Sequence, residues 1–212
     1  MDFSLETALL AIVPVVFAIV LHEAAHGYVA RLFGDQTAWM LGRVTLNPIK
    51  HIDPIGTLAV PGLLLLTGAP FLFGWAKPVP VNFGNLRHPK RDMIWVAAAG
   101  PGINFAMAVL WALIARAAAP SGPWTSEGLY LMAQIGISIN LVLMVLNLLP
   151  IPPLDGGRIA VGLLPERAAG VLARLEPYGF IVILVLLVTG LLGDLMRPIL
   201  RAAAFLLYAI TG

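Results

Sequence analysis

The chain has 212 residues, of which 59% are hydrophobic and only 11% are charged. Soluble domains carry about 25% charged residues, so this composition excludes an ordinary soluble globule and indicates a membrane protein. The net charge of +2 is too small to favour nucleic-acid binding, and the absence of cysteine excludes disulfides and thiolate metal sites.

Apolar segments along the chain predict several membrane-spanning helices, because a span needs about 20 apolar residues. In chain order the candidates are residues 5–29, 93–118, 128–149 and 178–192, with a shorter apolar piece at 199–210. The acidic start MDFSLE lacks the basic region of a signal peptide, so the first segment is expected to be retained. Residues 56–75 are apolar but interrupted by proline and glycine, which predicts a re-entrant segment.

Lysine and arginine are unevenly distributed between these segments. Seven lie between residues 31 and 91 and three between residues 150 and 177, whereas the N-terminal tail and residues 120–127 contain none. The positive-inside rule places the first two regions in the cytoplasm and the N-terminus outside. With this topology the first and third spans run in the same direction, which puts His22 and Asn147 near the inner leaflet.

Three ionisable residues interrupt the first span, in AIVLHEAAHGYVARLFG (residues 18–34). His22 and His26 are four residues apart, so both lie on one face of a helix and can reach one ion. In the pattern His-Glu-x-x-His, two imidazoles bind zinc and the glutamate, here Glu23, acts as general base. The alternative is a pair of packing histidines. Each ionisable group inside a bilayer costs about 3 kcal/mol, which favours the metal site.

The stretch NLLPIPPLDGGR (residues 147–158) offers a third ligand. Its prolines end the preceding helix, and Asp155 then returns to an apolar region at the depth expected for His22. A carboxylate in that position has a divalent cation as its natural partner. The alternative role of Asp155 is to cap a helix that begins at Gly156.

Residues 37–47 and 77–85 contain short stretches rich in tryptophan, valine and threonine, bounded by glycine and proline. They predict a small β-sheet on the cytoplasmic side, whose edge could pair with an extended substrate. A plain surface hairpin is the alternative. His51 and His88 lie in proline-flanked loops, where they are expected to be solvated.

The motifs HEAAH and NLLPIPPLDGG together resemble the signature of the site-2 protease family of intramembrane zinc metalloproteases. That signature is His-Glu-x-x-His in one span and Asn-x-x-Pro-x-x-x-Leu-Asp-Gly at the end of a later one. Similarity extends to GRVTLNP (42–48), HIDPIGT (51–57), GWAKPVPVN (74–82) and AGPGIN (99–104), so the resemblance covers about residues 1–165. A compact member without a PDZ or nucleotide-sensing domain is expected.

The resemblance implies site roles residue by residue. Zn²⁺ is expected to be held by His22, His26 and Asp155, with Glu23 as general base. Asn147 is expected to bind the substrate or to stabilise the oxyanion, with an interhelical hydrogen bond as the alternative.

We therefore predict an all-α polytopic membrane protein. The expected fold is a bundle of about 5–6 transmembrane helices with a small cytoplasmic-side β-sheet and a re-entrant segment. Residues 1–212 are expected to form one domain, with a catalytic core over about 1–165 and C-terminal helices over about 178–211. Asn104 and Asn140 are expected to support site residues or to pack helices together.

The predicted function is that of a zinc endopeptidase that cuts single-span membrane proteins within the bilayer, near its cytoplasmic edge. One alternative is a membrane zinc protease that acts on prenylated tails, although such enzymes complete the site with a glutamate rather than an aspartate. The other is a divalent-metal transporter, which would need polar residues through the whole membrane and has no use for Glu23 beside His22.

Overall fold

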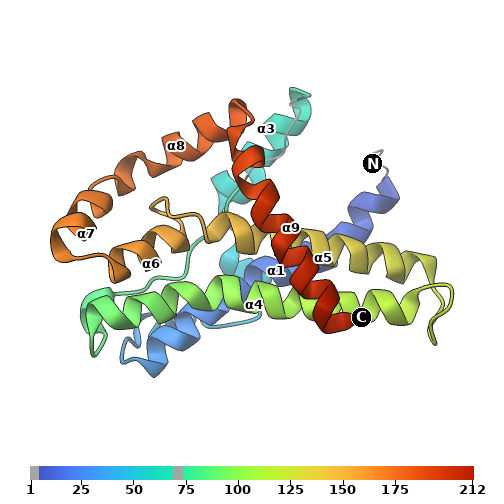
Figure 1. Cartoon of the computed structure of the whole chain (residues 1–212), viewed down its shortest axis with the longest axis horizontal. Coiled ribbons are helices and arrows are strands. Elements are labelled where there is room, and N and C mark those ends of the chain that lie inside the picture. The colour runs from blue at the N-terminus through green and yellow to red at the C-terminus, as the bar shows by residue number, and fades with distance from the viewer. Residues whose placement is uncertain (1–4, 69–73) are drawn as a thin grey trace.

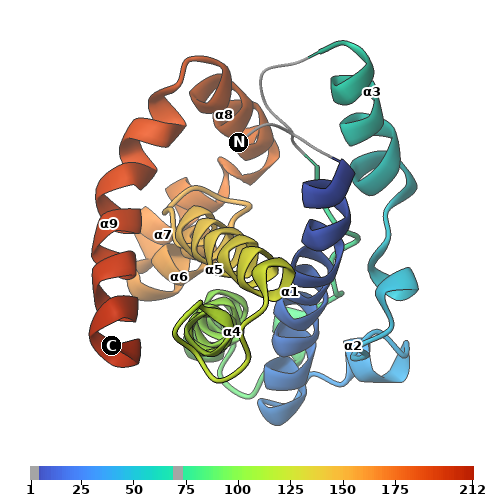
Figure 2. The ribbon, with the colours of Figure 1, turned by 90° about the vertical axis from the view of Figure 1, so that its right-hand side faces the viewer.

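Helices account for all the regular structure in the computed structural model, which describes residues 5–68 and 74–212. Three long helices form its centre: α1 (Leu5–Leu32), α4 (Pro89–Ala118) and α5 (Glu127–Asn147). Helices α4 and α5 lie side by side, with α1 on one side and the C-terminal helices curving round the other (Figures 1 and 2). These C-terminal helices are α6 (Asp155–Leu163), α7 (Glu166–Ala173), α8 (Glu176–Val188) and α9 (Leu191–Thr211).

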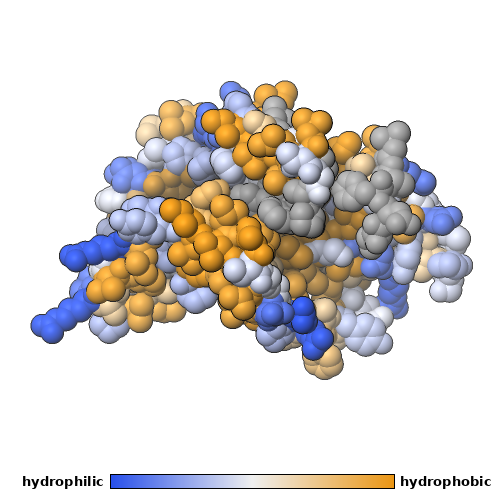
Figure 3. All heavy atoms as spheres, turned by 90° about the horizontal axis from the view of Figure 1, so that it is seen from above, coloured by the Kyte–Doolittle hydropathy of each residue, from blue (hydrophilic) through white to orange (hydrophobic). Residues whose placement is uncertain are grey.

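The three central helices are long and apolar enough to cross a membrane. The pair α7 and α8 passes the same test only as one span bent by 64°, so the described residues hold three candidate spans, or up to four. The prediction of about 5–6 spans is therefore too high. The physical reason is that α8 has only 13 residues and that α9 carries three charged residues in its first half, Asp194, Arg197 and Arg201. Figure 3 shows apolar side chains across the middle of one face, with the most hydrophilic ones mainly toward its ends and edges.

The central helices alternate in direction. On α1 and α4, His26 contacts Val96 while Ala18 contacts Asn104, so the two helices are antiparallel. Asn104 also donates to Asn140 on α5, and the indole of Trp111 packs over Gly136. Helix α4 is therefore antiparallel to α5 as well, and α1 and α5 run in the same direction.

The main apolar core lies where α5 packs against α4 and α9. Its buried members come from these helices and from the start of the turn after α5: Ala108, Leu141, Met144, Val145, Leu149, Leu192, Met196, Ala203 and Leu207. This packing holds the end of α5, and with it the turn that leads to Asp155, against the centre of the bundle.

The predicted β-sheet is wrong: no strand forms in residues 5–68 or 74–212. Thr37–Met40 is instead a helical turn, α2, and residues 77–82 are extended without a β partner. Two prolines in the second segment, Pro78 and Pro80, have no N–H to give to a ladder. The Arg43 side chain, rather than a neighbouring strand, donates to the carbonyls of Lys77 and Pro78.

The segment predicted to be re-entrant begins with a π-helical turn, Pro54–Ala59, and α3 (Val60–Leu66). Residues 69–73 of this segment lie outside the described residues. At the far end, Trp75 N donates to Gly56 O and Thr57 Oγ1 donates to Trp75 O, at 3.0 and 2.9 Å. The two ends of the segment therefore meet, which is the geometry that a re-entrant segment requires.

Candidate metal centre

Two helices bring together His22, His26 and Asp155. The histidines lie one turn apart on α1, and Asp155 is the first residue of α6. Asp155 Oδ2 lies 3.2 Å from His22 Nε2 and 3.4 Å from His26 Nε2, and the two Nε2 atoms are 3.1 Å apart. The potential ligand atoms all lie within 4.8 Å of one another, so this group could hold one metal ion.

The other ring nitrogen of each histidine is bound to the protein. His22 Nδ1 lies 2.6 Å from Asn104 Oδ1, and His26 Nδ1 lies 2.7 Å from Val96 O. Asn104 Nδ2 donates to Ala18 O and Asn140 Oδ1, so Asn104 Oδ1 is the acceptor for His22. Both Nδ1 atoms therefore carry the hydrogen, and in the neutral rings both Nε2 lone pairs are free for a metal.

The donor set fits a divalent metal ion. Asp155 Oδ2 is buried and accepts no hydrogen bond from the described residues, although it faces two imidazole nitrogens. An ionised carboxylate and two ring nitrogens at this spacing need positive charge between them, either as protons on the rings or as a metal ion.

Glycines give the site its room. A Cβ atom on Gly100 of α4 would lie 2.5 Å from His22 Cε1 and from His26 Nε2, so only glycine fits beneath the rings. After Asp155, a side chain on Gly156 would collide with Leu148 O. The absence of a side chain there lets α6 start directly against the end of α5, which sets Asp155 opposite the histidines.

Glu23 lies beside the histidines on α1, and its Oε2 accepts a hydrogen bond from Val79 N at 2.7 Å. The contact joins residues 56 positions apart, and Val79 is 7% exposed. The sequence prediction for Glu23 did not include this partner. A signal for it was present, because the flanking prolines leave Val79 with the one N–H of residues 78–80.

The chain is similar to known proteins over most of its length. A sequence profile described as "Peptidase family M50" matches residues 116–190, which include Asn147 and Asp155. "Putative zinc metalloprotease YwhC" of Bacillus subtilis is 42% identical over 195 residues, which are 90% of this chain and 85% of that protein. The chain belongs to peptidase family M50, the site-2 proteases.

Longer relatives match the M50 chain as well. Proteins named "Putative zinc metalloprotease Rip2" are 34% identical over 176 residues in Mycolicibacterium smegmatis and 30% over 173 residues in Mycobacterium tuberculosis H37Rv. The chain covers 64% and 62% of their lengths, slightly less than two thirds. No solved structure matches the chain. Family membership and the three apolar helices make this a multi-pass membrane protein.

The structure also gives contacts for other residues singled out in the M50 sequence. Asn147 Nδ2 donates to Leu143 O within its own helix. His88 is exposed, as expected, but His51 is 2% exposed and its Nε2 contacts Thr45 O, so the expectation that His51 is solvated is wrong. Helix α6 begins at Asp155 itself, and Leu154 occupies the cap position without a side-chain cap, so Asp155 is not the N-cap.

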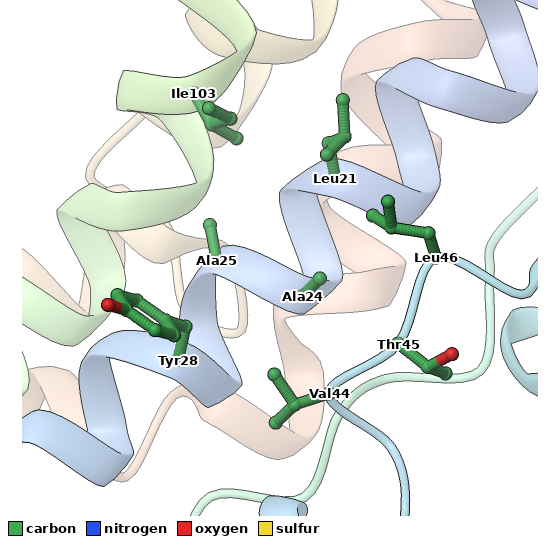
Figure 4. Close-up of a pocket in the computed structure, with 8 residues that line it drawn as sticks. All are labelled: Leu21, Ala24, Ala25, Tyr28, Val44, Thr45, Leu46 and Ile103. Atoms are coloured by element: carbon green, nitrogen blue, oxygen red, sulfur yellow. The ribbon is translucent and has the colours of Figure 1, made fainter.

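An open apolar groove of about 330 Å³ lies along α1 (Figure 4). Ala24, Ala25 and Tyr28 of α1 form part of its wall, and Val44 and Leu46 of the segment after α2 face them. Ala24, Ala25 and Tyr28 belong to the helix that carries Glu23. The groove therefore places an apolar surface next to the metal-site helix.

Proposed function

We propose that this M50 protein is an intramembrane zinc endopeptidase that cleaves single-span membrane proteins within the bilayer, near its cytoplasmic edge. The observation that carries the proposal is the convergence of three ligand atoms within 4.8 Å, beside Glu23. The names of the relatives, which describe zinc metalloproteases, support both the metal and the activity.

The roles follow from the donor chemistry. His22, His26 and Asp155 are the proposed zinc ligands, and Glu23 is the proposed general base. When bound, zinc supplies a Lewis acid that makes water nucleophilic at neutral pH. Glu23 takes a proton from the attacking water and returns it to the amine nitrogen as the peptide C–N bond breaks. Asn147 is proposed to donate to the oxyanion with the second hydrogen of its Nδ2, because the first is donated to Leu143 O.

The proposed substrates are apolar single-span segments, and the groove along α1 supports this choice because its lining is almost wholly apolar. A substrate helix has its backbone hydrogen bonds satisfied internally, so it must unwind locally before a carbonyl reaches the site. The proposed orientation has the N-terminus outside and the cleavage site near the cytoplasm. The distribution of lysine and arginine supports it.

The test measures zinc content and cleavage of a model single-span peptide by the purified full chain. The wild-type protein is expected to hold about one zinc ion per chain and to cleave the peptide. Glu23→Gln should keep the zinc and lose about 10²–10⁴-fold in kcat, because the general base is gone. Asp155→Ala should lose both zinc and cleavage. Cleavage by Glu23→Gln at the wild-type rate would contradict the proposal.

A further inference from the structure

An extended segment, residues 77–82, passes over the metal-site helix; we call it the strap. Its Val79 N–H donates to Glu23 Oε2 at 2.7 Å. Pro78 and Pro80 flank Val79, and proline has no N–H, so the strap offers Glu23 a single backbone donor at this point. A hydrogen bond to an ionised carboxylate is about twice as strong as one between neutral groups.

Both ends of the strap are fixed by contacts that do not involve Glu23. At one end, Lys77 N donates to His51 O at 2.9 Å, and the Arg43 side chain donates to Lys77 O at 3.0 Å. At the other end, Asn82 N donates to the buried Asp35 carboxylate at 2.7 Å. The position of the Val79 N–H is therefore set before a substrate binds, which is the condition for a useful positioning group.

We propose that the Val79 N–H positions Glu23: it holds the carboxylate through Oε2 and leaves Oε1 to take and return the proton. The inference rests on the proposed function of Glu23. In the reaction, water loses a proton to Oε1 while its oxygen bonds to the scissile carbonyl carbon. The same proton passes to the amide nitrogen as the C–N bond breaks, so Glu23 ends as it began. Without the Val79 N–H, the carboxylate samples other rotamers and reaches the water less often.

The first test removes only the N–H. In the full-length protein, Val79 is replaced by its α-hydroxy acid, which turns the amide into an ester and keeps the side chain. We expect kcat to fall about ten- to hundredfold, with KM and zinc content unchanged. The matched control is the same replacement at Val81, which also follows a proline in the strap and whose N–H donates to no other described residue. This control should cleave at the wild-type rate.

A second control addresses the neighbouring carbonyl. The ester weakens Pro78 O as an acceptor, and Arg43 Nη2 lies 3.3 Å from that atom. Arg43→Met removes this contact, and with it the bond to Lys77 O that anchors the strap, but it keeps the Val79 N–H itself. It should therefore lose less activity than the Val79 ester. An equal loss of activity in Arg43→Met, with the Val79 amide still exchanging as slowly as in the wild-type protein, would overturn the inference.

Hydrogen exchange gives a readout that is independent of catalysis. The Val79 amide is expected to exchange slowly in the wild-type protein and at least about tenfold faster in Glu23→Ala, because its acceptor is gone. The Val81 amide should exchange at the same rate in both. An unchanged Val79 rate, or equal kcat values for the two esters, would overturn the positioning role. A wild-type protein without zinc-dependent cleavage would instead overturn the proposed function, which separates the two failures.

Discussion

Each histidine of the M50 site has one ring nitrogen bound to the protein and the other facing Asp155. For His22 the bound atom is held by Asn104, which is fully buried and is itself tied to Ala18 and Asn140. Partners of this kind fix the orientation of a metal-binding ring and raise its basicity. Asn104 is therefore expected to contribute to metal affinity without touching the metal.

Removing this partner should weaken zinc binding. Asn104→Ala leaves the His22 Nδ1–H buried without an acceptor, so we expect zinc affinity to fall about 10–100-fold, as measured by competition with a chelator. Asn104→Asp keeps an acceptor for His22 but loses the donor to Ala18 O and Asn140 Oδ1, so it should retain more affinity than Asn104→Ala and less than the wild-type protein. Asn140→Ala removes a partner of Asn104 but not of His22, so its effect should be smaller. Equal affinities in the wild-type protein and Asn104→Ala would exclude this role.

Single residues differ in how far the sequence could reveal them. The spacing of His22 and His26 predicts their shared face, and the carboxylate after the prolines predicts Asp155 as their partner; the structure brings the three together. His51 was expected to be solvated because its neighbours are loop-like. The structure instead buries His51: its ring contacts Thr45 O, and its backbone oxygen accepts from Lys77 N of the strap. The strap contact is long-range, so the sequence around His51 does not reveal it.

Among the elements, helices followed from the sequence more reliably than the connections between them. Runs of about 20 apolar residues predict the three central helices almost to their ends. The prediction of a small sheet was wrong because it followed the β-like composition of residues 77–85. Two prolines in that segment remove N–H groups that a strand needs for pairing. The strap is instead held by side chains far away in the sequence, chiefly Asp35 and Arg43.

Asp35 connects the loop after α1 to the strap, and its effect on stability should depend on pH. Burial raises the pKa of Asp35, but hydrogen bonds from Thr37, Asn82 and Asn85 outweigh burial and lower the pKa below its usual value. A carboxyl group whose pKa is lower in the folded than in the unfolded protein stabilises the fold at pH values above its unfolded-state pKa. This stabilisation is lost as the pH falls toward the folded-state pKa.

The replacement Asp35→Asn should therefore lower the melting temperature at pH 7, by the equivalent of about 1–3 kcal/mol of unfolding free energy. The difference from the wild-type protein should shrink as the pH is lowered below about 4. Thermal unfolding in detergent at pH 7 and pH 3.5 measures both. Asp194→Asn, at an exposed ion pair with Arg197, is the control and should change little at either pH. A deficit that is the same at both pH values would argue against an ionised Asp35.

For the molecule as a whole, the positive-inside rule places the N-terminus and the strap on opposite sides of the membrane, which requires an odd number of crossings between them. The alternating directions of α1, α4 and α5 agree with this expectation. For helix α9, composition alone does not decide whether the helix crosses the membrane. Its second half is apolar and suggested a span, whereas its first half is charged and does not. The sequence alone could not settle how this helix packs, since that depends on its buried face against α4 and α5.

Membrane orientation can be tested directly because the chain has no cysteine. The positive-inside rule places residues 120–127 outside and residues 150–177 inside. In intact cells, a membrane-impermeant maleimide should label Ser121→Cys, and it should label Arg167→Cys only after the cells are opened. Both positions are exposed, so poor access does not explain a difference between them. The reverse pattern would invert the topology.

X-ray absorption spectroscopy at the zinc edge can show whether His22, His26 and Asp155 hold zinc. The measurement uses the Glu23→Gln protein, which keeps the proposed ligands but does not turn over substrate. We expect about two imidazole nitrogens and one or two oxygens at roughly 2.0–2.2 Å from the zinc, and the loss of this signal in Asp155→Ala. A spectrum with a single imidazole, or one unchanged by Asp155→Ala, would contradict this expectation.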